Sequence, residues 1–197
     1  MAGKEQRGGA APERVLSAAL NLFSRHGVSG TSLQMIADEL GVTKAAVYHR
    51  FQSKEEIVWA VVAPALERLA EVAREAEAQP RRSRQVGTAL AGVVDLVVEH
   101  RRVSAIILTD PAVSRLVRGH PVLYALEERI NRVLAGPEPD AETLVGAAML
   151  SGGLMAAGLD PRLADLDDDT LRRHLLDTAR RLMRLRPLPR ARTATEF

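Results

Sequence analysis

Apolar residues recur at helical spacing from the start of the chain, and the first three runs predict a bundle of short helices. After Pro12, a residue suited to the first turn of a helix, apolar positions follow three or four residues apart, and Gly27 ends the run. Two shorter runs cover residues 33–40 and 44–51. The inward positions of the three runs are Val15, Ala18, Ala19, Leu22, Phe23, Leu33, Ile36, Ala37, Leu40, Val47 and Phe51. We expect these side chains to share one small core.

Polar residues between the runs match the ends of helices. Ser32 and Thr43 stand directly before the second and third runs, where a side-chain oxygen can accept a hydrogen bond from a free backbone N–H. Gly41 follows the second run, at a position that often needs a positive φ. Ser53 and Glu56 form a capping box. The pattern therefore predicts two helices joined by a tight turn, followed by the capped start of a longer helix.

The outward face of residues 44–50 is basic and aromatic, and small at its leading end. Such a face suits the major groove of DNA, which is roughly 12 Å wide and admits a helix. Small alanines would let the backbone approach and their methyl groups contact thymine, while a lysine can donate to guanine. A lysine at residue 54, beside the start of the next helix, could hold a phosphate. The outward residues are Lys44, Ala45, Ala46, Tyr48, His49 and Arg50.

The stretch TSLQMIADELGVTKAAVYHRFQSKEEI closely resembles the DNA-binding signature of the tetracycline-repressor (TetR) family of bacterial transcription regulators. The resemblance covers about residues 12–58. Members of this family bind operators as dimers and release them when a small molecule enters a C-terminal helical domain. By position, the resemblance implies contacts at or near the bases from Gln34, Lys44, Ala45, Ala46 and His49, and phosphate contacts from Ser32, Thr43, Tyr48 and Lys54.

One position departs from the family pattern, and several have a simpler alternative. Arg50 stands where the family often has an aromatic ring, so its contact is either a phosphate or a base. Tyr48 could instead be a core ring with an exposed hydroxyl. His49 and Lys54 could be solvated side chains that contact no DNA.

The rest of the chain predicts further helices and no strands, so the fold class is all-α with about nine helices. A helix over residues 54–79 contains Pro64, which is expected to bend it, and would link the DNA-binding head to the remainder. Further helices are expected at residues 83–103, 103–108, 121–135, 140–158 and 167–186. The predicted division is a disordered arm (1–11), a helix-turn-helix domain (12–53), a helical effector-binding and dimerisation domain (54–186) and a disordered tail (187–197).

The last two predicted helices are candidates for dimerisation. The segment LVGAAMLSGGLMAAG is crowded with glycine and alanine, which let another backbone come close. The resemblance agrees, because dimers of the family commonly pair these two helices into a four-helix bundle. The alternative is an internal core. The predicted dimer contacts are Gly146, Ala147, Gly152, Gly153, Leu171, Leu175, Thr178 and Leu182.

A ligand pocket is implied mainly by the resemblance. A gap among the middle helices would be apolar with a few polar groups, which favours a mostly apolar effector. For most of its residues the alternative is ordinary core packing. The predicted pocket residues are Trp59, Val62, Leu66, Val97, His100, Ile107, Tyr124 and Met149.

Composition and charge narrow the choice of function. The chain has 197 residues, no cysteine and a net charge of +2. Residues 1–54 carry +3 and residues 180–197 carry +5, so the segment between them is acidic, which fits a DNA-binding module on a domain that avoids DNA. The apolar runs are too short for a membrane span, and no signal peptide is expected. These features favour a cytoplasmic protein.

No pattern of catalysis stands out. The five histidines lack metal-ligand spacing, and there is no phosphate-binding glycine loop or nucleophile elbow. We therefore expect no enzyme, no metal site and no cofactor. The remaining alternatives are a helical interaction or small-molecule-binding protein without specific DNA binding, and a cofactor-free helical enzyme.

Overall fold

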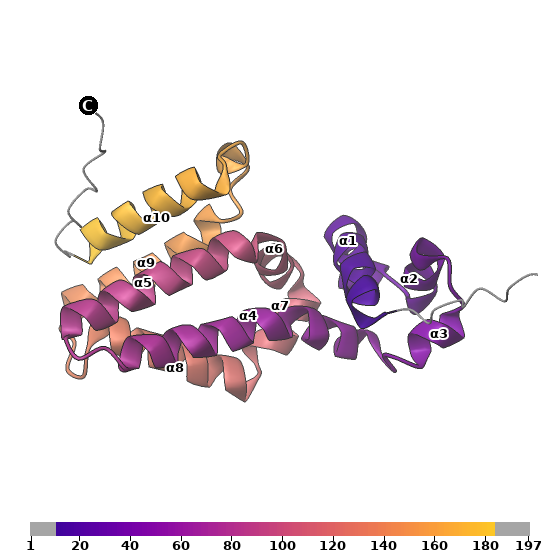
Figure 1. The fold of residues 1–197 in the computed structure, drawn as a ribbon, viewed down its shortest axis with the longest axis horizontal. Coiled ribbons are helices and arrows are strands. Elements are labelled where there is room, and N and C mark those ends of the chain that lie inside the picture. The colour runs from indigo at the N-terminus through magenta and orange to yellow at the C-terminus, as the bar shows by residue number, and fades with distance from the viewer. Residues whose placement is uncertain (1–10, 184–197) are drawn as a thin grey trace, which may run out of the picture. The chain divides into compact units, whose positions relative to one another are not determined.

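The computed structural model describes residues 11–183, which form ten α-helices and one short 3₁₀ helix (Figure 1). The predicted arm lies almost wholly outside these residues, and the predicted tail lies entirely outside them. The helices are α1 (Pro12–Gly30), α2 (Leu33–Leu40), α3 (Lys44–Tyr48), α4 (Lys54–Glu77), α5 (Arg82–Glu99), α6 (Arg101–Thr109), α7 (Pro111–Arg118), α8 (Pro121–Ala135), α9 (Ala141–Ala157), η1 (Pro161–Leu163) and α10 (Asp168–Leu182). The predicted all-α class is confirmed.

The chain divides into two compact units. The first contains residues 11–70 and 100–126, and the second contains residues 71–99 and 127–183. The predicted boundary at residue 54 therefore does not coincide with a boundary between the units. The physical reason is that α6 and α7 pack against α1 and share its core. The assignment of residues 54–186 to an effector domain remains a prediction.

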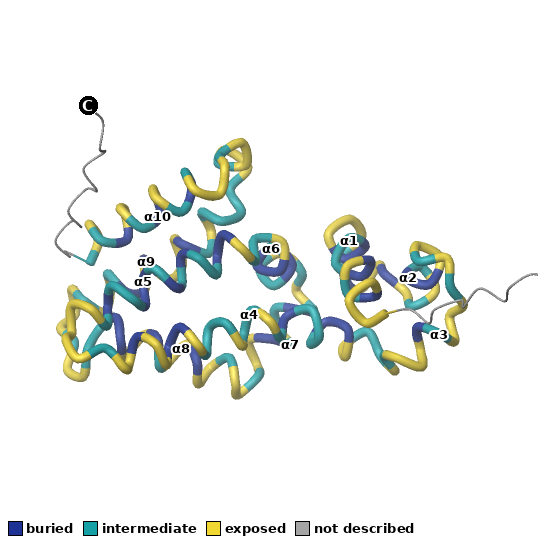
Figure 2. Tube along the Cα trace, viewed as in Figure 1, coloured by how far each residue is buried: buried dark blue, intermediate teal, exposed yellow. Residues whose placement is uncertain are grey.

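The core of the first unit is built from the predicted stripe on α1 together with residues far along the chain. Val15, Ala18, Ala19, Leu22 and Phe23 are all buried, as the periodicity predicts. Leu33, Leu40 and Phe51 are half-buried against the same cluster. Figure 2 shows the buried positions repeating along the inner faces of the helices. The other buried members of the cluster are Val28, Ile36, Ala37, Val47, Ile57, Val58, Val62, Val103, Ile106, Val113 and Val117.

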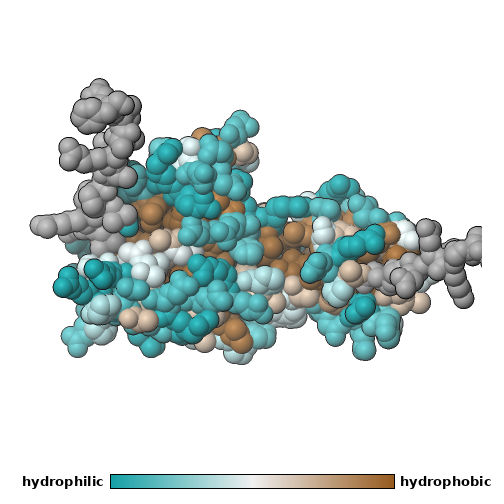
Figure 3. Space-filling model, in the orientation of Figure 1, coloured by the Kyte–Doolittle hydropathy of each residue, from teal (hydrophilic) through white to brown (hydrophobic). Residues whose placement is uncertain are grey.

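The second unit packs α5 against α10 and α9. Figure 3 shows apolar residues gathered between α10 and α5. At one point α4 and α5 come unusually close, because a Cβ placed on Gly92 would lie 2.5 and 2.6 Å from the two methyl carbons of Val72. Arg172 joins α10 to α5 through a 2.7 Å ion pair with Asp95. Arg82 donates hydrogen bonds to the carbonyls of Val133 and Leu134 at the end of α8.

One helix was not anticipated. We expected no helix between residues 108 and 121, but Asp110 and Pro111 begin α7. The Asp110 side chain accepts hydrogen bonds from the N–H groups of Ala112 and Val113, and proline occupies the first helical position, where its missing N–H costs nothing. Val113 and Val117, four residues apart, are buried. The signal was a cap followed by proline, which also marks an ordinary turn.

Candidate nucleic-acid interface

The turn between α2 and α3 is held by the predicted caps. The Ser32 hydroxyl accepts a hydrogen bond from the Met35 N–H, and the Thr43 hydroxyl accepts one from the Ala46 N–H. Gly41 ends α2 with φ of +65°, a conformation that costs a residue with a side chain considerable strain. These local interactions fix the direction in which α3 leaves the turn. The predicted helix-turn-helix is therefore present.

The recognition helix α3 is shorter than predicted, because regular helix ends at Tyr48. Beyond it the backbone tightens into a final turn, in which the N–H groups of both Arg50 and Phe51 donate to the carbonyl of Val47. The side chain of Val47 is completely buried and anchors this small element to the core. The opposite face is free for a partner.

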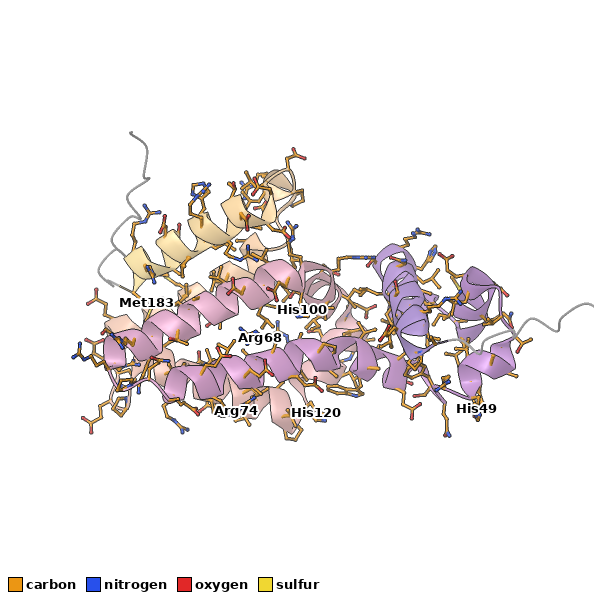
Figure 4. The ribbon with its side chains drawn as sticks, viewed as in Figure 1. His49, Arg68, Arg74, His100, His120 and Met183 are labelled. Carbon is orange, nitrogen blue, oxygen red and sulfur yellow. The ribbon has the colours of Figure 1, made fainter. Side chains whose placement is uncertain are left out.

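The outward residues of this segment form an exposed positive face. Lys44, Ala45, Tyr48, His49 and Arg50 are exposed, and Ala46 is half-buried. The Tyr48 ring is 54% exposed, which excludes the alternative that it is a core residue. Figure 4 shows His49 at the outer end of α3, away from the other helices. No carboxylate occurs between residues 40 and 54, so the positive charge of this face is not neutralised by neighbours in sequence.

The hydroxyl groups that cap α2 and α3 can still donate a hydrogen bond to a phosphate. A hydroxyl that accepts a hydrogen bond from a backbone N–H still has its own O–H to donate. Ser32 and Thr43 are both exposed, so either could donate to a DNA backbone while capping its helix. Gln34 is exposed as well, and its side-chain amide donates to Asp38 at 2.7 Å within α2. The second N–H and the oxygen of this amide remain available to a base.

Lys54 has a partner that the sequence did not suggest. Its ammonium nitrogen donates to the carbonyl oxygens of Val28 at 2.8 Å and Ser29 at 3.4 Å, at the end of α1. The lysine thus binds backbone carbonyls of the head. The alternative that it is a fully solvated charge is wrong. The phosphate contact predicted for Lys54 would have to be made by an ammonium that already donates to these carbonyls, so we expect the structural role to prevail.

The predicted pocket residues differ widely in their exposure. Tyr124 is 64% exposed and Met149 is 62% exposed, so both side chains face solvent in the single chain, contrary to the prediction. Trp59 packs its ring against His120, with centroids 4.3 Å apart. Val62 and Val97 are buried, while Leu66, His100 and Ile107 are half-buried. Val62 and Val97 therefore fit the alternative, in which they are ordinary core residues.

The predicted dimer contacts separate into two groups. Ala147, Leu171 and Leu175 are buried within the chain's own core, so they are wrong as contacts with a second subunit. Gly152, Gly153, Thr178 and Leu182 are exposed, and Gly146 is half-buried with open space where a Cβ would stand.

Three apolar side chains on α9 that were not among the predicted dimer contacts are exposed. Leu144, Val145 and Met149 are 52%, 59% and 62% exposed. They lie on the same helix as the exposed Gly152 and Gly153. Periodicity could not find this face, because α9 is apolar on all sides. Among the described residues, they are the largest apolar side chains that α9 offers to a partner.

Two further findings concern metals and membranes. Within residues 11–183, no three histidine or acidic side chains are grouped so that they could hold a metal ion. None of the helices in that part of the chain is long and apolar enough to cross a membrane.

Comparison with known proteins identifies the head. Residues 15–61 match the family described as bacterial regulatory proteins, tetR family. The transcriptional regulator SrpR of Pseudomonas putida is 45% identical over 51 residues, which are 26% of this chain and 24% of SrpR. The matched segment thus spans about a quarter of that curated relative.

Solved structures extend the likeness to the whole fold. The TetR-family regulator PfmR of Thermus thermophilus is 20% identical, with a TM-score of 0.66 over 87% of this chain and 98% of PfmR. NalD, the secondary repressor of the MexAB-OprM multidrug efflux pump in Pseudomonas aeruginosa, is 26% identical, with a TM-score of 0.57 over 86% of this chain and 94% of NalD. Residues 15–61 are therefore a DNA-binding head of the TetR type, and the chain has the fold of TetR-family regulators.

Proposed function

We propose that this protein is a transcription regulator that binds a near-palindromic operator as a homodimer and releases it when a small molecule binds. The observation that carries the proposal is the exposed positive face of residues 44–50 on a helix-turn-helix of the TetR type. A face of this kind on a protein that bound no DNA would have no evident partner. The protein would act as a repressor in the cytoplasm, where the chromosome lies.

In the proposed complex, α3 enters the major groove and α2 lies across the backbone. Lys44, Ala45, Ala46 and His49 read bases, together with Gln34 from α2. Ser32, Thr43 and Tyr48 donate to phosphates, and Arg50 contacts either a phosphate or a base. The phosphate contacts set the position of the head, and the base contacts set its sequence preference.

A dimer supplies the second head. Recognition helices in successive major grooves are roughly 34 Å apart, so two heads must be held at a fixed spacing. The exposed apolar face of α9, with Leu144, Val145 and Met149, supports a subunit contact there, joined by the exposed Thr178 and Leu182 of α10. Burying such a face stabilises a dimer by about 25 cal/mol per Å² of apolar surface.

An effector would act by favouring a dimer with a different spacing of the heads. It can lower operator affinity only by the difference between its affinities for the two states. We expect a mostly apolar small molecule, and we expect α4, which begins in the head, to take part in the change. Its identity is open to a direct search by thermal-shift screening of apolar and weakly polar compounds.

The test of the proposed function is footprinting on the DNA that flanks the protein's own coding region. We expect one protected site with two-fold symmetry, whose half-sites are centred one or more helical turns apart. Affinity should fall steeply with salt, because neutralised phosphates release counterions. A chain that binds these fragments no better than random DNA at low salt is not an operator-binding regulator.

A further inference from the structure

The end of α1 is bent and is held by charged side chains from two distant helices. Gly27 leaves the helical conformation with φ of +69°, and the short turn that follows leads into α2. At this turn the peptide groups of Val28 are held on both sides. The Val28 N–H donates to a carboxylate oxygen of Asp110 at 2.7 Å, and the Val28 carbonyl accepts from the ammonium of Lys54 at 2.8 Å.

Asp110 holds two elements with its two carboxylate oxygens. One oxygen caps α7 by accepting from the N–H groups of Ala112 at 2.9 Å and Val113 at 3.2 Å. The other accepts from Val28. A Cβ on Gly27 would lie 3.2 Å from that second oxygen, so the glycine also gives the carboxylate room. The residue therefore ties the start of α7 to the bend in α1, 82 positions earlier in the chain.

We propose that Asp110 is a positioning residue of the DNA-binding head. By accepting from Val28, it fixes the bend that leads into α2 and α3, and it makes the position of the recognition helix depend on α6 and α7. This inference rests on the proposed function, and it adds a route by which residues 100–118 regulate operator binding.

A surface hollow of about 500 Å³ lies beside the bend, and its lining residues come from α1, α6 and α7. Gly27, Ser29 and Asp110 are among them. Beneath the hollow, Val28 of α1 and Val113 of α7 belong to one buried cluster. The hydrogen bond from Val28 to the carboxylate of Asp110 adds to this packing, and a bond to a charged group is stronger than a neutral one.

The bend is connected to α2 by a short segment that is anchored by one buried residue. Thr31, the residue after α1, is 2% exposed, and its hydroxyl donates to the carbonyl of Gly27 at 2.8 Å. Ser32 then caps α2. A loosened bend would therefore let α2 and α3 adopt several positions. Operator affinity would fall by the fraction of molecules in which the heads fit the grooves.

The test separates the two roles of Asp110. Asp110→Ser retains a hydroxyl that can cap α7 but is too short to reach Val28, whereas Asp110→Ala loses both interactions. The matched control is Asp160→Ser, because Asp160 also caps a helix, by accepting from the Arg162 N–H, and lies in the other compact unit. Operator affinity and amide hydrogen exchange at single residues are measured on the full-length protein.

We expect Asp110→Ser and Asp110→Ala to weaken operator binding about tenfold, the factor that one hydrogen bond to a charged group accounts for. Amide exchange should accelerate at Val28 and in α2 and α3, while Leu171 and Leu175 in α10 exchange as in the wild type. Asp160→Ser should change neither quantity. Wild-type affinity and wild-type exchange at Val28 in Asp110→Ser would overturn the proposal.

The outcome is distinguishable from failure of the proposed function. If the wild-type protein prefers no DNA sequence, the operator-binding proposal fails, and exchange in α2 and α3 still decides whether Asp110 positions the head. If the wild type binds its operator and Asp110→Ser binds equally well with a faster Val28 amide, the tie exists but does not position α3, and the inference is wrong.

Discussion

At the scale of residues, two charged side chains next to the head bind its backbone groups. Asp110 accepts hydrogen bonds from N–H groups of two helices, and Lys54 donates to two carbonyls at the end of α1. Each satisfies main-chain groups that a helix end leaves without a partner. The charge on such a side chain thus contributes to the stability of the head as well as to its surface potential.

The pKa of Asp110 makes this contribution dependent on pH. Desolvation raises the pKa, but hydrogen bonds from the N–H groups of Val28, Val113 and Ala112 together lower it below the ordinary value of 3.8. A carboxyl group with a lowered pKa in the folded state stabilises the protein above its unfolded pKa, and this contribution is lost as the pH falls through the folded pKa.

We therefore expect Asp110→Asn to lower the free energy of unfolding by roughly 1 kcal/mol at pH 7, since the group is partly exposed. The difference from the wild type should shrink as the pH falls below the ordinary pKa of 3.8. Urea unfolding of both proteins between pH 7 and pH 3 measures it. A difference that stays constant over this range would show that ionised Asp110 does not stabilise the fold.

Lys54→Gln distinguishes a structural lysine from a phosphate contact. Because the ammonium already donates to the carbonyls of Val28 and Ser29, we expect the variant to melt at a lower temperature. The slope of log affinity against log salt should stay at the wild-type value. A lysine that neutralised one phosphate would instead reduce that slope by about 0.9 when removed. Thermal unfolding and operator binding between 50 and 200 mM salt, the range in which such slopes are resolved, provide the measurement.

At the scale of elements, close packing decides what a helix tolerates. Helix α3 has five residues, too few to be stable alone, so its caps and the buried Val47 hold it in place.

In the second unit, α5 contains two glycines whose surroundings differ. Gly92 faces the methyl groups of Val72 on α4, whereas no atom lies within 4 Å of the place where a Cβ on Gly87 would stand.

Alanine at these two positions should have opposite effects. Gly92→Ala would force its Cβ against Val72 and destabilise the protein by about 1–3 kcal/mol. Gly87→Ala meets no obstacle and should stabilise α5 by up to about 1 kcal/mol, because alanine favours helix over glycine. Urea unfolding at one fixed protein concentration compares them. Equal effects of the two substitutions would show that α4 and α5 are not in contact at Gly92.

At the scale of the whole molecule, α9 has an apolar face that no other helix of the same chain covers. Val145 on this face is 59% exposed, and Val122 at the start of α8 is 50% exposed. The two valines differ in surroundings, because Val145 has exposed apolar neighbours on the same helix and exposed glycines beyond them. Only the first valine is expected to meet a second subunit.

Val145→Glu should therefore convert the proposed dimer to a monomer, because two charges would be buried across the symmetric contact without partners. Operator affinity should fall at least about tenfold as the second head is lost. Val122→Glu, the matched control, should leave the molar mass and the affinity unchanged. Light scattering coupled to size-exclusion chromatography reports the mass, and a Val145→Glu protein that remained a dimer would place the subunit contact elsewhere.

Features that depend on neighbouring residues could be predicted from the amino-acid sequence. The stripe on α1, the caps at Ser32 and Thr43 and the positive φ at Gly41 follow from interactions spanning a few residues, so their signals are complete within short stretches. The same stretch carries the resemblance to the TetR family, and the family match at residues 15–61 agrees with it. Local chemistry was therefore enough to locate the recognition helix and its outward face.

The folded chain was needed to show which distant groups meet and which sides of an apolar helix are covered. The bond from Val28 to Asp110 joins residues 82 positions apart, and no periodic pattern links them. Helix α9 is apolar all round, so its sequence could not tell that Ala147 is buried while Val145 and Met149 are exposed. The physical reason is that a helix carries its own hydrogen-bond pattern, whereas the covering of its faces depends on partners supplied by the rest of the chain.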